Sequence, residues 1–240
     1  MDTEQKLERK NQTCSIPDDL AIKIVSNLEI WDVCALSGCC RFWRELCSSD
    51  WLWEDLCRER WPSLDSSERS SVEGWRCFYI KRHKEMADGA NVVANFVKQN
   101  SPTKSLEVGD YLRSIEQLYT RGLGFKDVVI LLFASKESAL LNLVGVHYSI
   151  FLLGVPADLV LEALRSCHIS ERLVCVRWWK LGRWFYGFRL RDESRCRRVS
   201  LGDLVSDKEE EVLGVLHRGT IHEVLRVQIS VADGPCTLWG

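Results

Sequence analysis

The segment from Ser15 to Trp61 constrains the fold of this chain more than any other part. It begins "SIPDDLAIKIVSNL" and continues at once with "EIWDVCALSGCCRFWRELCSSDWLWEDLCRERW", which is dense in Trp, Cys and Leu. Leu20, Ile24 and Leu28 recur every four residues, the spacing of an apolar helix face. Helices of about ten residues cannot enclose a core by themselves. Either the rest of the chain or another protein must therefore cover this segment.

The same segment divides into four short predicted helices. Pro17 suits the first residue of a helix, and the pair Asp18–Asp19 places negative charge at its positive end. A second helix is expected over residues 31–37, a third over 39–47 and a fourth after Ser49 or Asp50 until Pro62. Four short helices in succession indicate a small helical module.

This module resembles an F-box. That motif is an apolar residue with Pro, an acidic pair and Leu, then apolar residues at fixed helix turns, then Cys, a basic residue and Trp, with a last Trp further on. The chain carries these as "IPDDL" (16–20), Ile24, Leu28, Val33, Leu36, "CRFWREL" (40–46) and Trp53. It departs from the pattern at Ile16, where Leu is commoner, at residues 29–31, where Pro often stands, and at Gly38.

The resemblance implies a role in ubiquitin ligation. F-box helices dock onto a Skp-family adaptor, which joins them to a cullin and a RING protein, while the other half of the chain holds a protein substrate. The chain would then be a non-catalytic substrate-recognition subunit with no catalytic residues of its own. Carried over by position, the adaptor-binding residues are Ile16, Pro17, Leu20, Ile24, Leu28, Val33, Leu36 and Trp43, and the residues of the module's own core are Cys40 and Trp53.

Periodicity alone leaves two alternatives open. The apolar stripes of residues 14–61 could instead pack inside a helical bundle with residues 62–168, in a structural or interaction protein. The chain could also be an enzyme with its active site in residues 105–240, which a deep pocket with convergent polar groups and a displaced pKa would favour. No G-x-S-x-G, P-loop, H-E-x-x-H or dinucleotide fingerprint is present, so no motif names a reaction.

Beyond the module, an α+β organisation is expected, with a mostly helical middle and a small antiparallel sheet at the C-terminal end. The domain prediction is a disordered tail at 1–13, the helical module at 14–61, a linker and connecting helices at 62–104, and an α+β receptor domain at 105–240. Within these, Gly89 is expected to stop one connecting helix before a second, shorter one. Residues 125–134 read equally well as a buried strand or a helix.

After Ser170 the apolar period changes to two, as in strands with one wet face. In "RWWKLGRWFYGFRLRDESRCRRVS" arginines interleave with aromatic residues, and "KLG" and "DES" are turn-like breaks between strands. Because guanidinium forks match carboxylate and phosphate, this stretch predicts a face for an acidic or phosphorylated substrate. A plain sheet with its aromatics inward and its arginines outward remains possible. The candidate substrate-binding residues are Arg177, Trp178, Arg183, Arg189 and Arg191.

Composition narrows the classes of partner. A net charge of −2 over 240 residues argues against nucleic acid. Residues 139–155 are apolar but contain Asn142 and His147 and lack basic flanks, so a buried core helix is favoured over a membrane span. We expect no membrane partner and no cofactor.

The cysteines point to a reducing compartment. Their number is odd at 11, and the polar N-terminal stretch lacks the pattern of a secretory signal. We therefore expect free thiols and a location in the cytoplasm, the nucleus or both. No C-x-x-C pair occurs, so no metal site is expected. Cys167 and His168 are sequence neighbours that point in different directions on a helix, which disfavours a thiol–imidazole pair.

Overall fold

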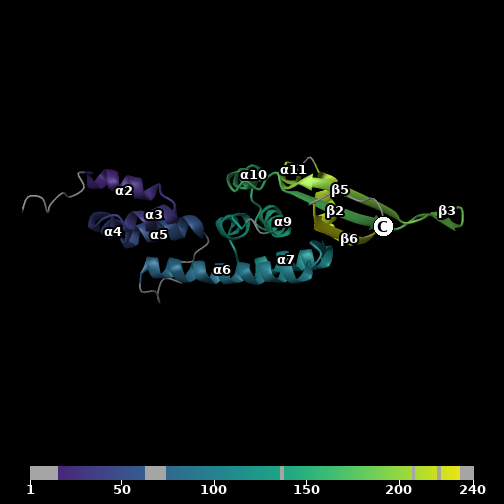
Figure 1. The fold of residues 1–240 in the computed structure, drawn as a ribbon, viewed down its shortest axis with the longest axis horizontal. Helices are drawn as coiled ribbons and strands as arrows, with labels where there is room; N and C mark the ends of the chain where they lie inside the picture. Colours follow the sequence, from purple (N-terminus) through teal and green to yellow (C-terminus); the bar gives the residue numbers. More distant parts are fainter. Residues whose placement is uncertain (1–15, 63–73, 136–137, 207–208, 221–222, 233–240) are drawn as a thin grey trace, which may run out of the picture. The chain divides into compact units, whose positions relative to one another are not determined.

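The computed structural model describes residues 16–62, 74–135, 138–206, 209–220 and 223–232 (Figure 1). The predicted tail at 1–13 and almost all of the predicted serine-rich break at 62–71 lie outside these residues. The chain divides into two compact units, residues 1–83 and 84–240, and the division falls inside one long helix. The α+β class is confirmed: the fold is mostly helical, with a small antiparallel sheet near the C-terminus.

The first unit consists of short helices. They are α2 (Asp18–Ser26), α3 (Ile30–Ser37), α4 (Arg41–Cys47), α5 (Asp50–Arg60) and the start of α6 (Trp75–Asn100). Pro17 precedes α2 with an extended backbone, and Asp18 and Asp19 lie in its first turn. One apolar cluster joins the first four helices: Ala21, Val25, Val33, Trp43, Cys47 and Leu52.

Helix α6 corrects one prediction. Gly89 was expected to end a helix, but α6 continues through it to Asn100 as a single element. A glycine inside a helix costs only about 1 kcal/mol, which packing can offset. Gly89 is buried, and a Cβ there would lie 3.0 Å from Cδ of Arg121. The glycine is therefore explained by the close approach of the Arg121 side chain.

The second unit begins with the remainder of α6 and continues with β1 (Ser105–Glu107), a short strand absent from the prediction, and with α7 (Val108–Thr120). Residues 125–134 are helical: α8 (Phe125–Val128) runs into the π-helical turn η2 (Val129–Phe133). Helix α9 (Ala139–His147), the π-turn η3 (Tyr148–Leu152) and α10 (Ala157–Ser166) follow. The C-terminal helices are α11 (Leu201–Val205) and α12 (Glu210–Arg218).

Helix α9 is the buried core helix expected for the apolar stretch after Ser138. All of its residues are buried, and the amide of Asn142 donates to the carbonyls of Leu132 (2.6 Å) and Ser135 (3.3 Å). The Oδ1 of Asn142 accepts from Arg172 at 2.8 Å. These bonds satisfy the polar side chain inside the core. Within the described part of the chain, no helix is long and apolar enough to cross a membrane.

The sheet consists of β2 (Leu173–Lys180), β5 (Glu193–Ser200), β6 (Val224–Val231) and β1, in the order β1-β6-β2-β5 with every pair antiparallel. Figure 1 shows α7 and α9 beside it. Opposed residues on its inner face are buried, as in the pair Val174 and Val199. The outer face carries Arg177, Trp179 and Gln228, so the predicted period of two reflects one dry and one wet face.

Beyond this sheet, the hairpin of β2 and β5 extends into a two-stranded tip, β3 (Trp184–Phe185) and β4 (Phe188–Arg189). The predicted breaks at "KLG" and "DES" fall where β2 ends before β3 (residues 181–183) and where β4 ends before β5 (residues 190–192). The turn of the tip itself falls at Tyr186 and Gly187, both with positive φ (46° and 82°). Type I′ turns need positive φ at both central residues, and glycine tolerates it without cost. Lys180 and Glu193, taken from those two breaks, pair as strand residues.

Candidate protein-binding surfaces

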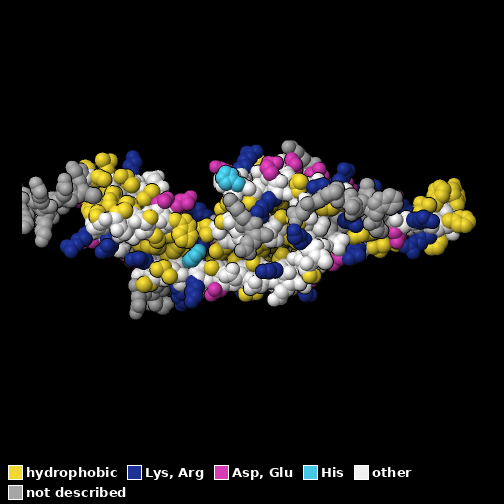
Figure 2. All heavy atoms as spheres, in the orientation of Figure 1, with side chains coloured by type: hydrophobic (Ala, Val, Ile, Leu, Met, Phe, Trp, Pro, Cys, Tyr) yellow, Lys and Arg dark blue, Asp and Glu magenta, His cyan; other side chains and the backbone are white. Residues whose placement is uncertain are grey.

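Helix α2 carries two interleaved sets of apolar residues. Ala21 and Val25 are fully buried against the other helices, whereas Leu20 is 55% exposed and Ile24 is 44% exposed. Pro17, one turn before Leu20, is exposed as well. Because residues three and four apart share a helix face, Pro17, Leu20 and Ile24 form one apolar stripe that faces solvent. In Figure 2 hydrophobic side chains gather over α2.

The other predicted adaptor-binding residues lie deeper. Ile16, Leu28 and Leu36 are half-buried against the apolar cluster of the first unit. Val33 is fully buried, and Trp43 is 8% exposed. The structure therefore brings all eight residues to one module but leaves only three of them fully available to a partner.

One exposed residue in this module was missing from the predicted site. Trp31, in the first turn of α3, is 62% exposed, the largest exposed fraction of any large apolar residue among residues 16–62 and 74–83. Exposed Trp is unusual in a monomer but frequent at protein interfaces. The signal in the sequence was that Trp31 belongs to residues 29–31, where the F-box pattern often has Pro after the first helix.

The two residues assigned to the module's own core lie among its helices. Cys40 is half-buried beside the apolar cluster. Trp53 is 3% exposed, and its Nε1 donates to the carbonyl of Cys47 at 2.8 Å. The Trp53 ring meets Tyr79 edge to face at 5.4 Å between centroids. Trp53 thus ties α5 to α4 and to the first turns of α6.

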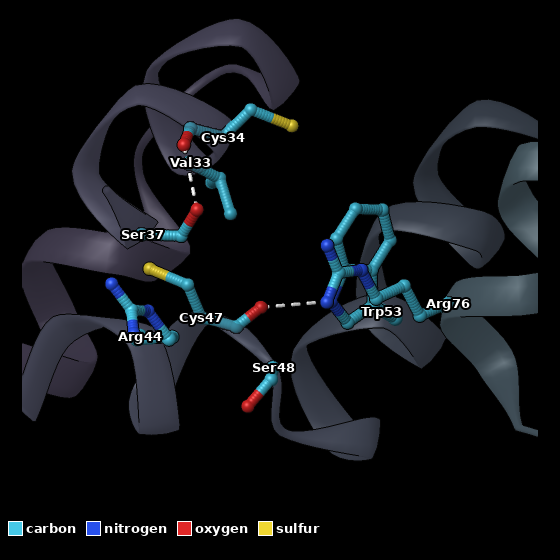
Figure 3. Close-up of a pocket in the computed structure, with 8 residues that line it drawn as sticks. All are labelled: Val33, Cys34, Ser37, Arg44, Cys47, Ser48, Trp53 and Arg76. Atoms are coloured by element: carbon cyan, nitrogen blue, oxygen red, sulfur yellow. Dashed lines mark hydrogen bonds between the residues drawn. The ribbon is translucent and has the colours of Figure 1, made fainter. Parts of the chain in front are cut away.

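A small pocket of about 190 Å³ lies beside Trp53 (Figure 3). The Ser37 hydroxyl donates to the carbonyl of Cys34 at 2.6 Å, and Arg76 lies over the Trp53 ring at 5.5 Å. Burial, followed by the charges of Cys34 and Cys39, raises the pKa of the Cys47 thiol. A raised pKa keeps this thiol protonated and unreactive at neutral pH. The pocket residues are Val33, Cys34, Ser37, Arg44, Cys47, Ser48, Trp53 and Arg76.

In the same module, a buried arginine joins α5 to α6. Arg60 is 4% exposed and donates to the Tyr79 hydroxyl at 2.7 Å, with His83 Nδ1 at 3.0 Å. Its guanidinium lies 4.8 Å from the centroid of the Trp61 ring. A buried guanidinium is tolerable only with such partners.

The predicted substrate-binding residues occupy different environments. Trp178 is fully buried in the sheet and offers no surface to a substrate. Arg177 is half-buried on the outer face, and Arg191 is exposed. Arg183 pairs with Glu223 at 3.2 Å, and Arg189 pairs with Asp192 at 2.9 Å. The main-chain N–H of Gly182, followed by Arg189, lowers the pKa of Asp192.

The tip of the hairpin is the most exposed apolar surface in the described residues. Five large apolar side chains crowd it, and Figure 2 shows them gathered there. A two-stranded ribbon cannot bury such side chains against itself. A plain sheet with these aromatics inward was one of the two alternatives left open by the alternation. Breaks at residues 181–183 and 190–192 instead separate the tip from the sheet. Their exposed fractions are 72% for Trp184, 62% for Phe185, 88% for Tyr186, 78% for Phe188 and 55% for Leu190.

The second unit also contains a buried histidine. His147 is 2% exposed; its Nδ1 lies 2.9 Å from the Tyr111 hydroxyl and its Nε2 lies 3.3 Å from Nδ1 of His217. Burial, followed by the charge of His217, lowers the pKa of His147 to about 3. The ring of Phe151 stacks on His217 at 4.3 Å. His147 is therefore neutral at physiological pH and packs as part of the core.

A wider hollow of about 460 Å³ lies where Lys104, Ser138 and Arg172 approach one another. Arg172 already donates to Asn142, as described above. Among the described residues, no group of three or more His, Cys, Asp and Glu is arranged to hold a metal ion. Cys175 and Cys196, on adjacent strands, bring their sulfur atoms to within 2.9 Å of each other.

The comparisons with known proteins identify the N-terminal module. The F-box-like family matches residues 13–59, and these residues are an F-box-like domain. Mouse F-box/WD repeat-containing protein 15 is 35% identical over 63 residues, 25% of this chain and 14% of the mouse protein. F-box protein SNE of Arabidopsis thaliana is 35% identical over 83 residues, 31% of this chain and 53% of the plant protein.

The predicted resemblance to the F-box protein family is thereby confirmed. The matched segments span about half of the plant relative and much less of the mouse protein. No solved structure matches the chain.

Proposed function

We propose that this chain is a substrate-recognition subunit of a Skp–cullin–F-box ubiquitin ligase. The observation that carries the proposal is the solvent-facing apolar stripe of α2 inside a domain of the F-box-like family. An apolar stripe on a short helix is completed by a partner helix or groove. The partner is a Skp-family adaptor, and the cullin and RING protein join through that adaptor.

The chain contributes proximity and no covalent chemistry in this proposal. Holding a substrate beside the charged conjugating enzyme raises the effective concentration of its lysines. The substrate half is the second unit, where the exposed Arg183, Arg189 and Arg191 surround the aromatic hairpin tip. Arg177 flanks them on the outer face of the sheet. The proposed location is the cytoplasm, the nucleus or both.

In this proposal the exposed residues contact the adaptor directly, and the buried residues hold the helices in position. Pro17, Leu20 and Ile24 make direct contact, and Trp31 extends this surface on the neighbouring helix. Ile16, Leu28 and Leu36 contribute their exposed portions, while Val33 and Trp43 hold the helices in the binding arrangement. Cys40 and Trp53 support the same core.

Co-expression with a Skp-family adaptor followed by size-exclusion chromatography tests the proposal. The wild-type chain is expected to elute as a one-to-one complex, and the double variant Leu20→Asp/Ile24→Asp to lose it. Burying an unpaired carboxylate in an apolar interface costs several kcal/mol, about 2–7 for an unbonded polar group. Ser26→Asp, at an exposed position of the same helix that is neither three nor four residues from Leu20 or Ile24, is the matched control and should retain the complex.

Two results would overturn the assignment. A wild-type chain that stays monomeric beside the adaptor would mean that the stripe has another role. A double variant that binds as well as the wild type would move the contact away from α2. Circular dichroism of each variant keeps unfolding distinct from lost binding, because Ala21 and Val25, which hold α2 in place, are unchanged.

A further inference from the structure

Strand β5 forms one edge of the four-stranded sheet. Among the described strands it pairs with β2 on one side only, and it is eight residues long, whereas the opposite edge strand β1 has three. An edge strand presents a row of main-chain donors and acceptors to any extended segment that approaches. The length of β5 is therefore sufficient for a ladder of several hydrogen bonds.

The register shows which main-chain groups face outward. Leu201 N–H donates to the carbonyl of Arg172 at 3.0 Å, while Ser200 stands opposite Leu173. In an antiparallel ladder, residues that exchange both bonds alternate with residues that exchange none. Arg195 and Arg197 consequently bond to β2, and Ser194 and Arg198 turn their N–H and C=O groups away from it.

Charge makes this edge selective. Arg195 pairs with Glu211 at 3.2 Å, and Arg198 donates to the carbonyl of Ala232 at 3.4 Å. Arg191 and Arg197 are exposed and have no ion pair among the described residues. Like charges directly opposite one another destabilise a strand pair. A second copy of β5 would place arginines against arginines, whereas a strand rich in carboxylates would pair with them.

The aromatic tip lies along the same segment of chain, just before β5. Phe188 and Leu190 are 78% and 55% exposed, and they precede Arg191 directly. Large apolar residues beside a polar ladder are the arrangement in which main-chain bonds give affinity and side-chain contacts give specificity. An apolar residue at one end of a bound strand would cover part of this tip.

We infer that the β5 edge binds an extended acidic segment of the substrate protein as an additional antiparallel or parallel strand. That the bound protein is a ubiquitination substrate rests on the proposed function. The inference adds the chemical class of the segment that is recognised. Carboxylates of that segment pair with Arg191 and Arg197, its main chain pairs with Ser194 and Arg198, and an apolar residue covers Phe188. The free edge, its charge and the exposed tip are three separate observations.

Fluorescence anisotropy with the full chain in its adaptor complex tests this inference. The probe is a short labelled peptide of alternating Glu and Val, compared with its Lys–Val counterpart and with a Glu–Val peptide N-methylated at alternate residues. The Glu–Val peptide should bind, and the other two should bind at least about tenfold more weakly. The Lys–Val peptide carries the same charge as the arginines, and the N-methylated peptide lacks main-chain N–H donors.

Two variants separate the causes. Ser194→Pro removes an outward N–H without touching the ladder to β2, because proline is tolerated on the open side of an edge strand. It should weaken peptide binding about tenfold or more and leave the circular dichroism spectrum unchanged. Arg197→Gln should weaken binding and reduce its dependence on salt. Lys126→Gln, outside the sheet, is the charge control and should change neither.

Each remaining outcome contradicts the inference. Equal binding of the N-methylated peptide would mean attraction by charge alone. Dimerisation that Ser194→Pro abolishes would make a second copy the occupant. Binding that appears only after removal of residues 233–240 would make that segment the occupant. Adaptor binding is read in the same sample, so an intact complex without peptide binding refutes this inference and spares the proposed function.

Discussion

The buried Arg60 allows a quantitative test of how the F-box-like domain is held to α6. Replacing Arg60 with Leu removes the bonds to the Tyr79 hydroxyl (2.7 Å) and to His83 (3.0 Å) and leaves both groups in a site where the arginine itself is only 4% exposed. A hydrogen bond to a charged group contributes about 1.5–3 kcal/mol. The buried Leu side chain regains part of this. We expect a loss of about 2–4 kcal/mol in the free energy of unfolding of this unit.

Tyr79→Phe removes the bond to the Tyr79 hydroxyl alone and should cost about 1.5–3 kcal/mol, since a buried charged group then loses one of its partners. The double variant should cost little more than Arg60→Leu alone. The sum of the two single losses minus the loss of the double variant is the coupling free energy, which should be about 1.5 kcal/mol or more. Urea unfolding of the full chain, followed by tryptophan fluorescence, measures all three.

Arg58→Leu is the matched control in the same helix. Arg58 pairs with Glu54, and its side chain is 65% exposed, so this pair contributes about 0–1 kcal/mol. The reasoning fails if Arg60→Leu is no more destabilising than Arg58→Leu. It also fails if the losses of Arg60→Leu and Tyr79→Phe simply add, because the two groups would then act independently.

Two further predictions concern the second unit. Burial holds the pKa of His147 at about 3, below its ordinary value of 6.5. As the pH falls, the unfolded chain therefore binds a proton at this histidine before the folded chain does. The stabilisation present above pH 6.5 is lost as the pH falls toward 3. Urea titrations should show that the free energy of unfolding falls by about 1.6 kcal/mol between pH 6.5 and 5. His147→Gln should flatten this pH dependence, and an equal slope in the variant would contradict the prediction. At the base of the hairpin tip, a Cβ on Gly182 would lie 1.9 Å from the carbonyl oxygen of Leu190. Gly182→Ala should therefore displace the tip and speed its cleavage by chymotrypsin, whereas an unchanged cleavage rate would contradict the close approach.

Sequence reasoning succeeded where a single helix face decides the structure. The spacing of Leu20, Ile24 and Leu28 located α2, and the match of F-box residues identified the domain that the family comparison found at 13–59. The same reasoning missed the continuation of α6 through Gly89, because the packing of Arg121 against that glycine is a tertiary contact. Local helix propensity does not include the effect of such a contact.

The Arg-rich stretch shows a different limit. Alternation allowed a plain sheet with its aromatics on one face, but the break between β2 and β3 at residues 181–183 divides the stretch into a buried part and a projecting part. Trp178 lies before that division and is fully buried; Trp184 lies after it and is 72% exposed. Two residues of the same type six positions apart thus have opposite roles. Only strand pairing, which depends on distant partners such as β6, distinguishes them.

Helix α2 places buried and exposed apolar residues at adjacent positions. Val25 is fully buried beside Ile24, which is 44% exposed, so one nine-residue helix uses adjacent positions for folding and for a surface. A carboxylate at position 25 would enter the core and unfold the domain, while one at position 24 would meet water in the free chain. The stripe is therefore not required by the fold of the isolated domain. The proposed adaptor contact accounts for its apolar character, since a helix gains no stability from exposing Leu20 and Ile24 to water.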